Sequence, residues 1–174
     1  MIEKFELLFN RDQIAATVKK LAREISRDYG NEEVVVISIL KGAFMFTADL
    51  IRELTCPIAV DFMRATSYGS GTRTSGNVTL TKDLEIDIAD KNVIIVEDII
   101  DSGLTLVSIR DLLLSRKPKS LKICALVDKR ARREVTIEGD YVGFTIEDGF
   151  IIGYGIDYAE LYRNVPEIYV DPDA

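Results

Sequence analysis

The clearest signal of the fold is the segment Val93-Ile-Ile-Val-Glu-Asp-Ile-Ile-Asp-Ser-Gly-Leu-Thr105. Its continuous apolar start is typical of a strand buried on both faces of a parallel sheet. The apolar run ends in two adjacent carboxylates, Glu97 and Asp98, and Asp101 follows three residues later. The small residues after Asp101 predict a tight turn into a helix. The stretch therefore predicts a strand, a turn and a helix, with acidic and hydroxyl side chains gathered at the turn.

The rest of the chain repeats this alternation of strands and helices. Asn10, with Gln13 three positions later, has the pattern of a capping box, and Gly30 is a typical helix stop. Apolar periodicity and turn residues predict helices over 10–29, 44–54 and 104–114, and strands over 34–40, 58–63, 93–96 and 121–127. After Lys129 we expect only shorter strands and turns. The pattern predicts an α/β fold, a right-handed parallel sheet covered by helices, with ligands at the carboxyl ends of its strands.

Length and composition predict one soluble domain spanning residues 1–174. Of the 174 residues 47% are hydrophobic, and the formal net charge is −7. No apolar run approaches the roughly 20 residues of a membrane span, and the acidic start of the chain is unlike a signal peptide. Cys56 and Cys124 lie among apolar residues, as expected of small hydrophobic side chains in a reducing compartment. We expect a cytoplasmic protein with no membrane partner.

The chain contains no histidine. This excludes an imidazole base, a histidine-activated nucleophile and histidine-ligated zinc. Acid–base chemistry must then use carboxylates, lysine or tyrosine. The surplus of acidic residues argues against a non-specific nucleic-acid binder, because such a protein needs surplus Lys and Arg to neutralise phosphates. We expect no nucleic-acid partner, whereas a small anionic ligand is compatible with this composition.

The turn after the acidic strand has the chemistry of a phosphate site. Backbone amides, the Ser102 and Thr105 hydroxyls and the positive end of a helix come together there. Glu97 and Asp98 would repel a phosphate, so we expect them to accept hydrogen bonds from hydroxyl groups or to face a hydrated cation. Together these groups predict a site for a ribose 5-phosphate. The alternative is an acidic helix cap, in which Asp101 only satisfies the amides at the helix end.

The stretch Val96-Glu-Asp-Ile-Ile-Asp-Ser-Gly-Leu-Thr105 resembles the phosphoribosyl-pyrophosphate motif of type I phosphoribosyltransferases, in the form found in the hypoxanthine-guanine branch. The resemblance implies a parallel-sheet core over about 30–145, flanked by helices, and a small hood formed by about 1–10 and 146–174. It also implies that the phosphoribosyl group is bound by Glu97, Asp98, Asp101, Ser102, Gly103, Leu104 and Thr105.

Two further segments resemble the pyrophosphate site of this family. Ser38-Ile-Leu-Lys-Gly42 is similar to the loop after the first core strand, where the Leu-Lys peptide is usually cis. The resemblance implies that Leu40, Lys41 and Gly42 bind pyrophosphate. Arg163, in Glu160-Leu-Tyr-Arg163, matches an arginine that contacts the same group.

The purine site of the family is matched by two later segments. Leu126-Val-Asp-Lys129 resembles the strand end whose lysine reaches the exocyclic oxygen of the base. In Asp148-Gly-Phe-Ile-Ile-Gly-Tyr-Gly-Ile-Asp157 the resemblance implies that Phe150 stacks on the base and that Ile151 reads it through its backbone. It assigns Mg²⁺ to Asp157, with Glu97 and Asp98 as further oxygen donors.

Two other stretches admit a plain and a functional interpretation. Residues 66–81 combine glycines with hydroxyls, which alone favours a flexible loop, but Ser67 and Tyr68 resemble the start of the family's mobile lid. Lys129 opens a basic run that ends at Arg133. For Arg130, Arg132 and Arg133 we expect a solvated face or a subunit contact.

The resemblance implies an enzyme that joins hypoxanthine or guanine to phosphoribosyl pyrophosphate, in the presence of Mg²⁺, as a homodimer or homotetramer. Asp101 is the expected general base, a role that suits a chain without histidine. Two alternatives stay open at this point. One is a phosphoribosyltransferase that prefers xanthine, and the other is a nucleotide-sensing regulator that binds RNA on the same fold.

Overall fold

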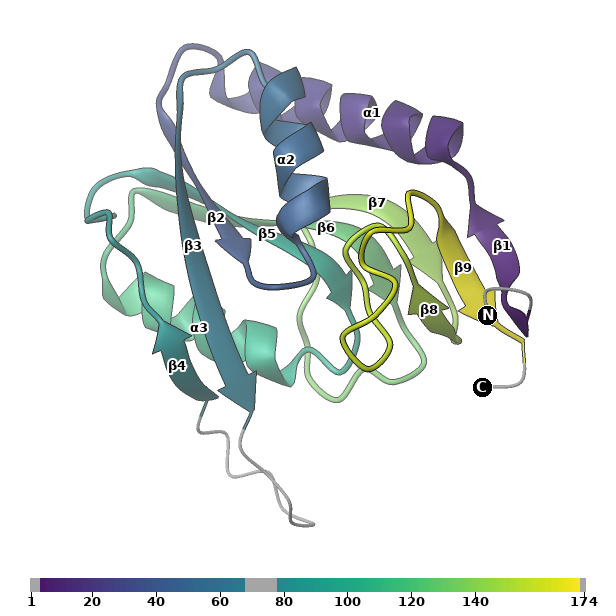
Figure 1. The fold of residues 1–174 in the computed structure, drawn as a ribbon. Helices are drawn as coiled ribbons and strands as arrows, with labels where there is room; N and C mark the ends of the chain where they lie inside the picture. Colours follow the sequence, from purple (N-terminus) through teal and green to yellow (C-terminus); the bar gives the residue numbers. More distant parts are fainter. Residues whose placement is uncertain (1–3, 68–77, 173–174) are drawn as a thin grey trace.

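The structure is a computed structural model that describes residues 4–67 and 78–172, and its main element is a six-stranded sheet (Figure 1). In the order β4-β3-β2-β5-β6-β7 the strands are Val78–Lys82, Ile58–Ser67, Val34–Ile39, Asn92–Ile100, Ser120–Lys129 and Tyr141–Ile146. The five strands from β3 to β7 in this order are parallel, and β4 pairs antiparallel with β3 at the edge. The predicted α/β class with a parallel sheet is confirmed.

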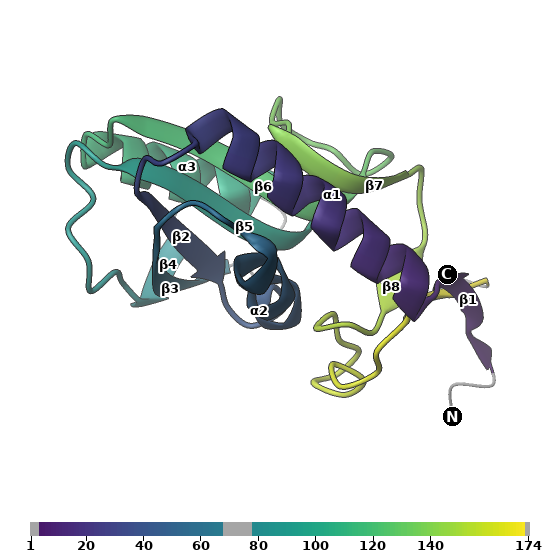
Figure 2. The ribbon, with the colours of Figure 1, turned by 90° about the horizontal axis from the view of Figure 1, so that it is seen from above.

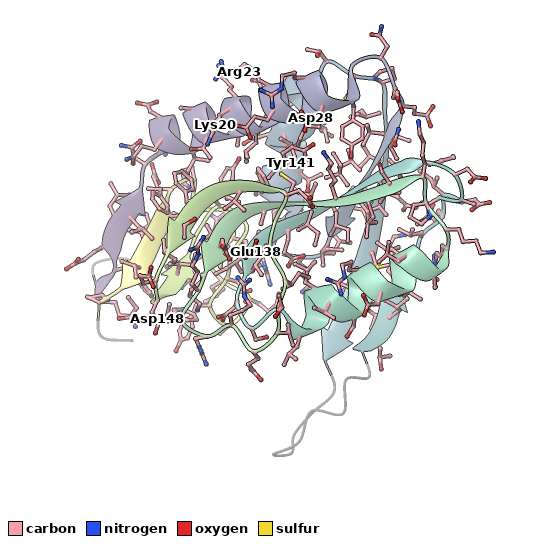
Figure 3. All side chains as sticks on the ribbon, turned by 180° about the vertical axis from the view of Figure 1, so that it is seen from behind. Lys20, Arg23, Asp28, Glu138, Tyr141 and Asp148 are labelled. Carbon is pink, nitrogen blue, oxygen red and sulfur yellow. The ribbon has the colours of Figure 1, made fainter. Side chains whose placement is uncertain are left out.

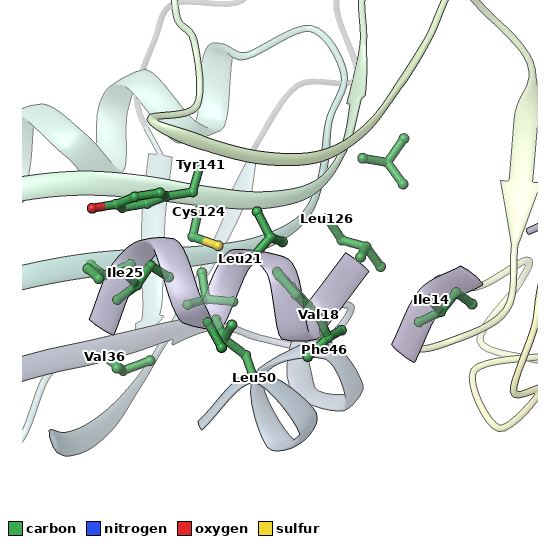
Figure 4. Close-up of a cluster of buried hydrophobic side chains, with 14 of the residues drawn as sticks. Ile14, Val18, Leu21, Ile25, Val36, Phe46, Leu50, Cys124, Leu126 and Tyr141 are labelled. Atoms are coloured by element: carbon green, nitrogen blue, oxygen red, sulfur yellow. The ribbon is translucent and has the colours of Figure 1, made fainter. Parts of the chain in front are cut away.

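Helices cover both faces of the sheet, α1 (Arg11–Tyr29) and α2 (Phe44–Glu53) on one face and α3 (Leu104–Ser115) on the other (Figures 1 and 2). Alternate side chains of the central strands divide between two cores, because successive residues of a strand point to opposite faces. Val36 and Val96 pack with α1 and α2, as Figure 4 shows for Val36, whereas Ile37 and Ile95 pack with α3. Burial on both faces explains why these strands are continuously apolar.

The capping box predicted from Asn10 and Gln13 is present. The Asn10 side chain accepts a hydrogen bond from the Gln13 amide at 2.9 Å, and the Gln13 side chain accepts one from the Asn10 amide at 2.9 Å. Gly30 ends α1 with a φ of 58°, and its amide donates to the Ser26 carbonyl at 2.9 Å. The predicted start and end of this helix are therefore confirmed.

The carboxyl end of α1 is fixed to the sheet by a polar cluster of Asp28, Lys122 and Tyr141, of which Figure 3 labels Asp28 and Tyr141. The Tyr141 hydroxyl donates to Asp28 Oδ2 at 2.8 Å and accepts from Lys122 Nζ at 2.9 Å. The hydrogen bond from Tyr141 lowers the pKa of Asp28, while burial raises the pKa of Tyr141 to about 12. The cluster lies on the α1 side of the sheet, where it holds the helix against β6 and β7.

A second, three-stranded sheet joins the two ends of the chain. In the order β1-β9-β8 its strands are Glu6–Phe9, Ile168–Asp171 and Phe150–Ile152, and both pairs are antiparallel. The Phe9 ring stacks on Phe144 of β7 with 3.8 Å between ring centroids. Through this contact the small sheet packs beside the β7 edge of the main sheet (Figure 1).

Several predicted boundaries differ from the structure. β5 continues four residues past Val96 to Ile100, and the loop predicted over 66–81 is too wide, because β3 ends at Ser67 and Val78–Lys82 forms β4. Tyr68, assigned to the lid, lies outside the described residues. Among the helices that the structure describes, none has the length and apolar character needed to cross a membrane.

Candidate active site

A cavity of about 240 Å³ opens at the carboxyl ends of β2 and β5. It is bordered by the loop after β2 on one side and by the turn between β5 and α3 on the other. Six residues predicted for the phosphoribosyl and pyrophosphate sites line it, namely Leu40, Glu97, Asp101, Ser102, Gly103 and Thr105. The position agrees with the rule that open α/β sheets bind ligands beyond the carboxyl ends of their strands.

The turn that leads into α3 is built around Gly103. Its φ is 84°, a left-handed conformation, and a Cβ at this position would lie 2.6 Å from Ile137 Cγ2, so the position requires glycine. The Leu104 amide faces the Ser102 hydroxyl at 3.4 Å. Gly103 occupies the N-cap position of α3, and within the described residues no hydrogen bond from an α3 amide to the Asp101 carboxylate is found. The alternative in which Asp101 is merely the helix cap is therefore wrong, and the first amides of α3 face the turn.

The carboxylate of Asp101 is paired with Lys129, the residue expected to read the base. Lys129 Nζ lies 3.1 Å from Asp101 Oδ2, and the lysine side chain is only 5% exposed. The other oxygen, Asp101 Oδ1, is buried and has no hydrogen-bond partner among the described residues. A buried acceptor without a partner costs about 1–3 kcal/mol, so this oxygen is suited to receive a donor from a ligand.

Glu97 and Asp98 form a coupled acidic pair at the end of β5. Burial, together with the charge of Asp98, raises the pKa of Glu97 well above its ordinary value. Burial also raises the pKa of Asp98, against the opposing effect of the Ile99 amide, which donates to Asp98 Oδ1 at 2.9 Å. The oxygens of both carboxyl groups can accept hydrogen bonds from hydroxyl groups.

The loop after β2 lies directly against this acidic pair. The Leu40–Lys41 peptide bond is cis, as the resemblance implied. A Cβ at Gly42 would overlap the Asp98 carboxylate, which explains why a residue without a side chain stands there. Leu40 lines the cavity, and Lys41 projects outward with 43% of its side chain exposed.

The two cations expected to contact pyrophosphate meet at one carboxylate. Glu160 Oε2 lies 2.7 Å from Lys41 Nζ and 3.5 Å from an Arg163 guanidinium nitrogen. Arg163 also pairs with Asp157 at 2.8 Å, and its Nε is buried with no partner among the described residues. Sequence reasoning missed Glu160. The available signal was its position in the same short segment as Arg163.

The residues expected to bind the purine lie at the junction of the two sheets. Lys129 Nζ donates to the Gly149 carbonyl at 3.4 Å, which joins the end of β6 to the start of β8. The Phe150 ring is partly exposed and meets the Tyr158 ring edge-on at 5.5 Å. Ile151 is 3% exposed and belongs to the hydrophobic core, so its side chain packs inside the protein; its predicted backbone contact with the base stays a prediction.

The three carboxylates predicted to bind Mg²⁺ are not preassembled. Within residues 4–67 and 78–172, no three acidic, cysteine or histidine side chains are grouped to hold a metal ion. Asp157 Oδ1 faces Arg163, and Oδ2 accepts a hydrogen bond from the Glu160 amide at 2.8 Å. Mg²⁺ commonly uses one or two carboxylates and completes its coordination with water and substrate phosphates. The oxygen donors of Asp157, Glu97 and Asp98 fit an ion that arrives with its substrate.

The interpretation of the basic run is wrong for Arg133. Arg130 and Arg132 are exposed, as expected for a solvated face. Arg133 has only 17% of its side chain exposed and donates hydrogen bonds to several backbone carbonyls behind the active-site turn. Periodicity could not distinguish it, because its partners are brought together only by the folded sheet.

Comparison with known proteins yields one consistent family. Residues 6–159 match the model of the phosphoribosyl transferase domain. The chain is 46% identical over 172 residues to a hypoxanthine-guanine phosphoribosyltransferase of Aquifex aeolicus, covering 98% of this chain and 97% of the relative. It is 50% identical over 165 residues to a hypoxanthine phosphoribosyltransferase of Salmonella typhimurium, covering 94% and 93%. A crystal structure of a hypoxanthine-guanine phosphoribosyltransferase from Bacillus anthracis superposes with a TM-score of 0.91 at 52% identity, covering 95% of this chain and 97% of that one.

Proposed function

The chain belongs to the phosphoribosyltransferase family and is an enzyme of purine salvage. We propose the following roles for its residues in the reaction. It transfers the 5-phosphoribosyl group from phosphoribosyl pyrophosphate to hypoxanthine or guanine, which yields the nucleoside monophosphate and pyrophosphate. The observation that carries the assignment is the Asp101 carboxylate, with one oxygen on Lys129 and the other buried without a partner among the described residues.

The phosphoribosyl group is bound by the turn and the acidic pair together. The 5-phosphate accepts hydrogen bonds from the amides and hydroxyls of residues 102–105, where the positive end of α3 favours an anion. The ribose hydroxyls face Glu97 and Asp98. Glu97 and the turn residues Ser102, Gly103 and Thr105 line the same cavity of about 240 Å³.

Lys41 and Arg163 together bind the pyrophosphate leaving group. As the anomeric bond breaks, positive charge builds on the ribose and negative charge on the leaving group. Fixed cations that face the leaving group stabilise this charge separation. Glu160 pairs with both cations and holds them in place before the substrate binds. When pyrophosphate is bound, it replaces Glu160 as their partner.

Asp101 removes the proton that the purine must lose as its ring nitrogen attacks the ribose. Its free oxygen Oδ1 accepts the base N–H, while Lys129 holds Oδ2. The same ammonium group donates to the exocyclic oxygen of hypoxanthine or guanine. Adenine presents an amino donor at that position, which would leave the buried lysine unpaired, and buried polar sites discriminate strongly against such a mismatch.

Mg²⁺, bound with the substrate through Asp157 and the acidic pair, would supply further charge neutralisation at the leaving group. The small sheet of both chain ends acts as a hood over the base, because Phe150 and Ile151 belong to its strand β8. The two free, buried cysteines suit a cytoplasmic enzyme. We expect a homodimer or homotetramer, and the exposed Phe44 and Phe62 rings offer apolar surface for such contacts.

A single assay tests the proposed function. Purified protein is supplied with phosphoribosyl pyrophosphate and Mg²⁺, together with hypoxanthine, guanine, xanthine or adenine in separate reactions, and nucleotide formation is followed by chromatography. We expect turnover with hypoxanthine or guanine and little with adenine. Equal turnover with adenine would refute the role of Lys129, and a clear preference for xanthine would refute hypoxanthine and guanine as the substrates. No turnover with any base would refute the proposed function.

A further inference from the structure

We propose that Arg133 is a positioning residue for this reaction, because it fixes the ends of β5 and β6 so that Asp101 and Lys129 meet at their working distance. The inference rests on the proposed function, since it assigns Asp101 and Lys129 the roles given above. Arg133 lies behind these residues and touches their backbones, so it acts on the reaction only through them.

The reacting pair lies where the pairing of β5 with β6 ends. The register between β5 and β6 ends with Ile100 opposite Asp128. Asp101 directly follows β5, and Lys129 is the last residue of β6, where its register partner is Ile146 of β7. The side chains of Asp101 and Lys129 meet at 3.1 Å. β7 thus holds the Lys129 backbone, whereas Asp101 lies beyond the last residue of β5 in the register with β6. The placement of Asp101 relative to Lys129 therefore needs another support, since ladder hydrogen bonds are what hold neighbouring strands in register.

The guanidinium group of Arg133 provides that support. Its Nε donates to the Asp101 carbonyl at 3.0 Å, and its Nη2 donates to the Lys129 carbonyl at 3.2 Å and the Ile100 carbonyl at 3.3 Å. One planar group thus bonds to both strands at the point where their register ends. Arg presents five N–H donors in a rigid plane, an arrangement that the flexible ammonium group of lysine does not reproduce.

The guanidinium is itself held from two other sides. It pairs with the Asp128 carboxylate, whose residue is 5% exposed, and donates to the Ile137 carbonyl. The Arg133 side chain is 17% exposed, so the fork is packed in place and largely removed from water. A charged group fixed in this way loses little further entropy for each hydrogen bond that it makes.

The segment that carries Arg133 also supports the phosphate turn. The Glu134 amide donates to the Ser102 carbonyl at 3.0 Å, and a Cβ at Gly103 would lie 3.3 Å from Arg133 Cδ. The base-facing pair and the turn consequently share one support behind the cavity. Lys41, by contrast, lies on the loop after β2 and pairs with Glu160, so the pyrophosphate side does not depend directly on this support.

Arg133→Lys tests the proposal, with Arg130→Lys as a matched control. Arg130 lies 3.5 Å from the same Asp128 carboxylate, but its side chain is 64% exposed. A misplacement of about 1 Å can cost about 10²-fold in rate, so we expect Arg133→Lys to lower kcat with hypoxanthine by about 10- to 100-fold. The KM for phosphoribosyl pyrophosphate should stay within about twofold, and Arg130→Lys should resemble the parent enzyme.

A double-mutant cycle separates positioning from a general loss of structure. If Arg133 acts through Asp101, Arg133→Lys should cost much less kcat in an Asp101→Asn background than in the parent, because the group that it positions has already been disabled. A merely structural role would give the same fold-loss in both backgrounds. Should Arg133→Lys fail to fold, Asp128→Asn, which keeps the guanidinium but removes its carboxylate partner, should lower kcat in the same direction.

An unchanged kcat in Arg133→Lys would overturn the proposal, and so would equal fold-losses in the two backgrounds. If Arg133→Lys does not fold, an unchanged kcat in Asp128→Asn would overturn it equally. These outcomes are distinct from a failure of the proposed function, which would show as absence of transferase activity in the parent enzyme itself.

Discussion

Replacing Asp101 by asparagine exchanges one carboxylate oxygen for an amide NH2 group and keeps the shape of the side chain. In the parent, Asp101 Oδ2 pairs with Lys129 at 3.1 Å, and Oδ1 is buried and free to accept a proton. Asparagine retains one carbonyl oxygen but cannot take up a proton at neutral pH. The substrates should still bind, because the turn amides and the cations on the pyrophosphate side are unchanged.

The expected magnitude follows from the role of a general base. Such a group contributes about 10²- to 10⁴-fold to the rate, which corresponds to about 2.7–5.4 kcal/mol of transition-state stabilisation. We expect Asp101→Asn to lower kcat by this factor. The KM for phosphoribosyl pyrophosphate should change little, since an interaction made mainly in the transition state affects kcat and kcat/KM together.

The assay is steady-state nucleotide formation with hypoxanthine, combined with thermal unfolding to show that the variant is folded. Asp111→Asn is the matched control. Its side chain is 58% exposed and, within the described residues, forms an ion pair only with the neighbouring Arg110. An unchanged kcat in Asp101→Asn would remove this residue from the mechanism. An equal loss in Asp111→Asn would show that the effect is not specific to the site.

Three further predictions test the base site, the turn and the fold. Lys129→Gln should reduce the ratio of kcat/KM for hypoxanthine to kcat/KM for adenine by about 10- to 100-fold, because the glutamine amide oxygen can accept a hydrogen bond from the amino group of adenine. An unchanged ratio would contradict this. Gly103→Ala should lower the free energy of unfolding by about 1–3 kcal/mol in urea titration, since it combines a φ of 84° with a contact of 2.6 Å to Ile137, and Gly30→Ala, with a φ of 58° but no atom within 4 Å, should cost less. Burial acts to raise the pKa of Asp61, but three backbone amides and a nearby lysine outweigh it and hold the pKa below the ordinary value of 3.8. The resulting stability is present above pH 3.8 and is lost as pH falls through the lower folded pKa, so Asp61→Asn should be less stable at neutral pH and should lose less stability on acidification. Identical acid-unfolding profiles of the variant and the parent would contradict the assignment.

The local signals of the sequence predicted the elements that depend on local physics. The capping box at Asn10 and the helix stop at Gly30 are short-range devices, and the apolar runs of β2 and β5 report burial on both faces whatever the neighbours are. The predicted turn at Gly103 likewise has a local cause, a backbone conformation that favours glycine. These features were therefore accessible without the structure.

Features created by distant parts of the chain were not accessible in the same way. Strand β4 lies at the end of a stretch rich in glycine and hydroxyl residues, and it forms the edge of the sheet by pairing antiparallel with β3. Arg133 was assigned to a solvated face or a subunit contact, because its carbonyl partners Ile100 and Asp101 lie more than thirty residues earlier in the chain. Glu160 was overlooked because its partner Lys41 is more than one hundred residues away.

We propose that one turn, at residues 101–105, binds the phosphate of the nucleotide while Asp101 and Lys129 face its base. The decisive experiment is a crystal structure of the enzyme with the nucleoside monophosphate formed from hypoxanthine. We expect the monoester on the amides of residues 102–105, with the purine ring nitrogen beside Asp101 Oδ1 and its exocyclic oxygen beside Lys129 Nζ. A monoester bound elsewhere, or a base turned away from Asp101, would contradict it.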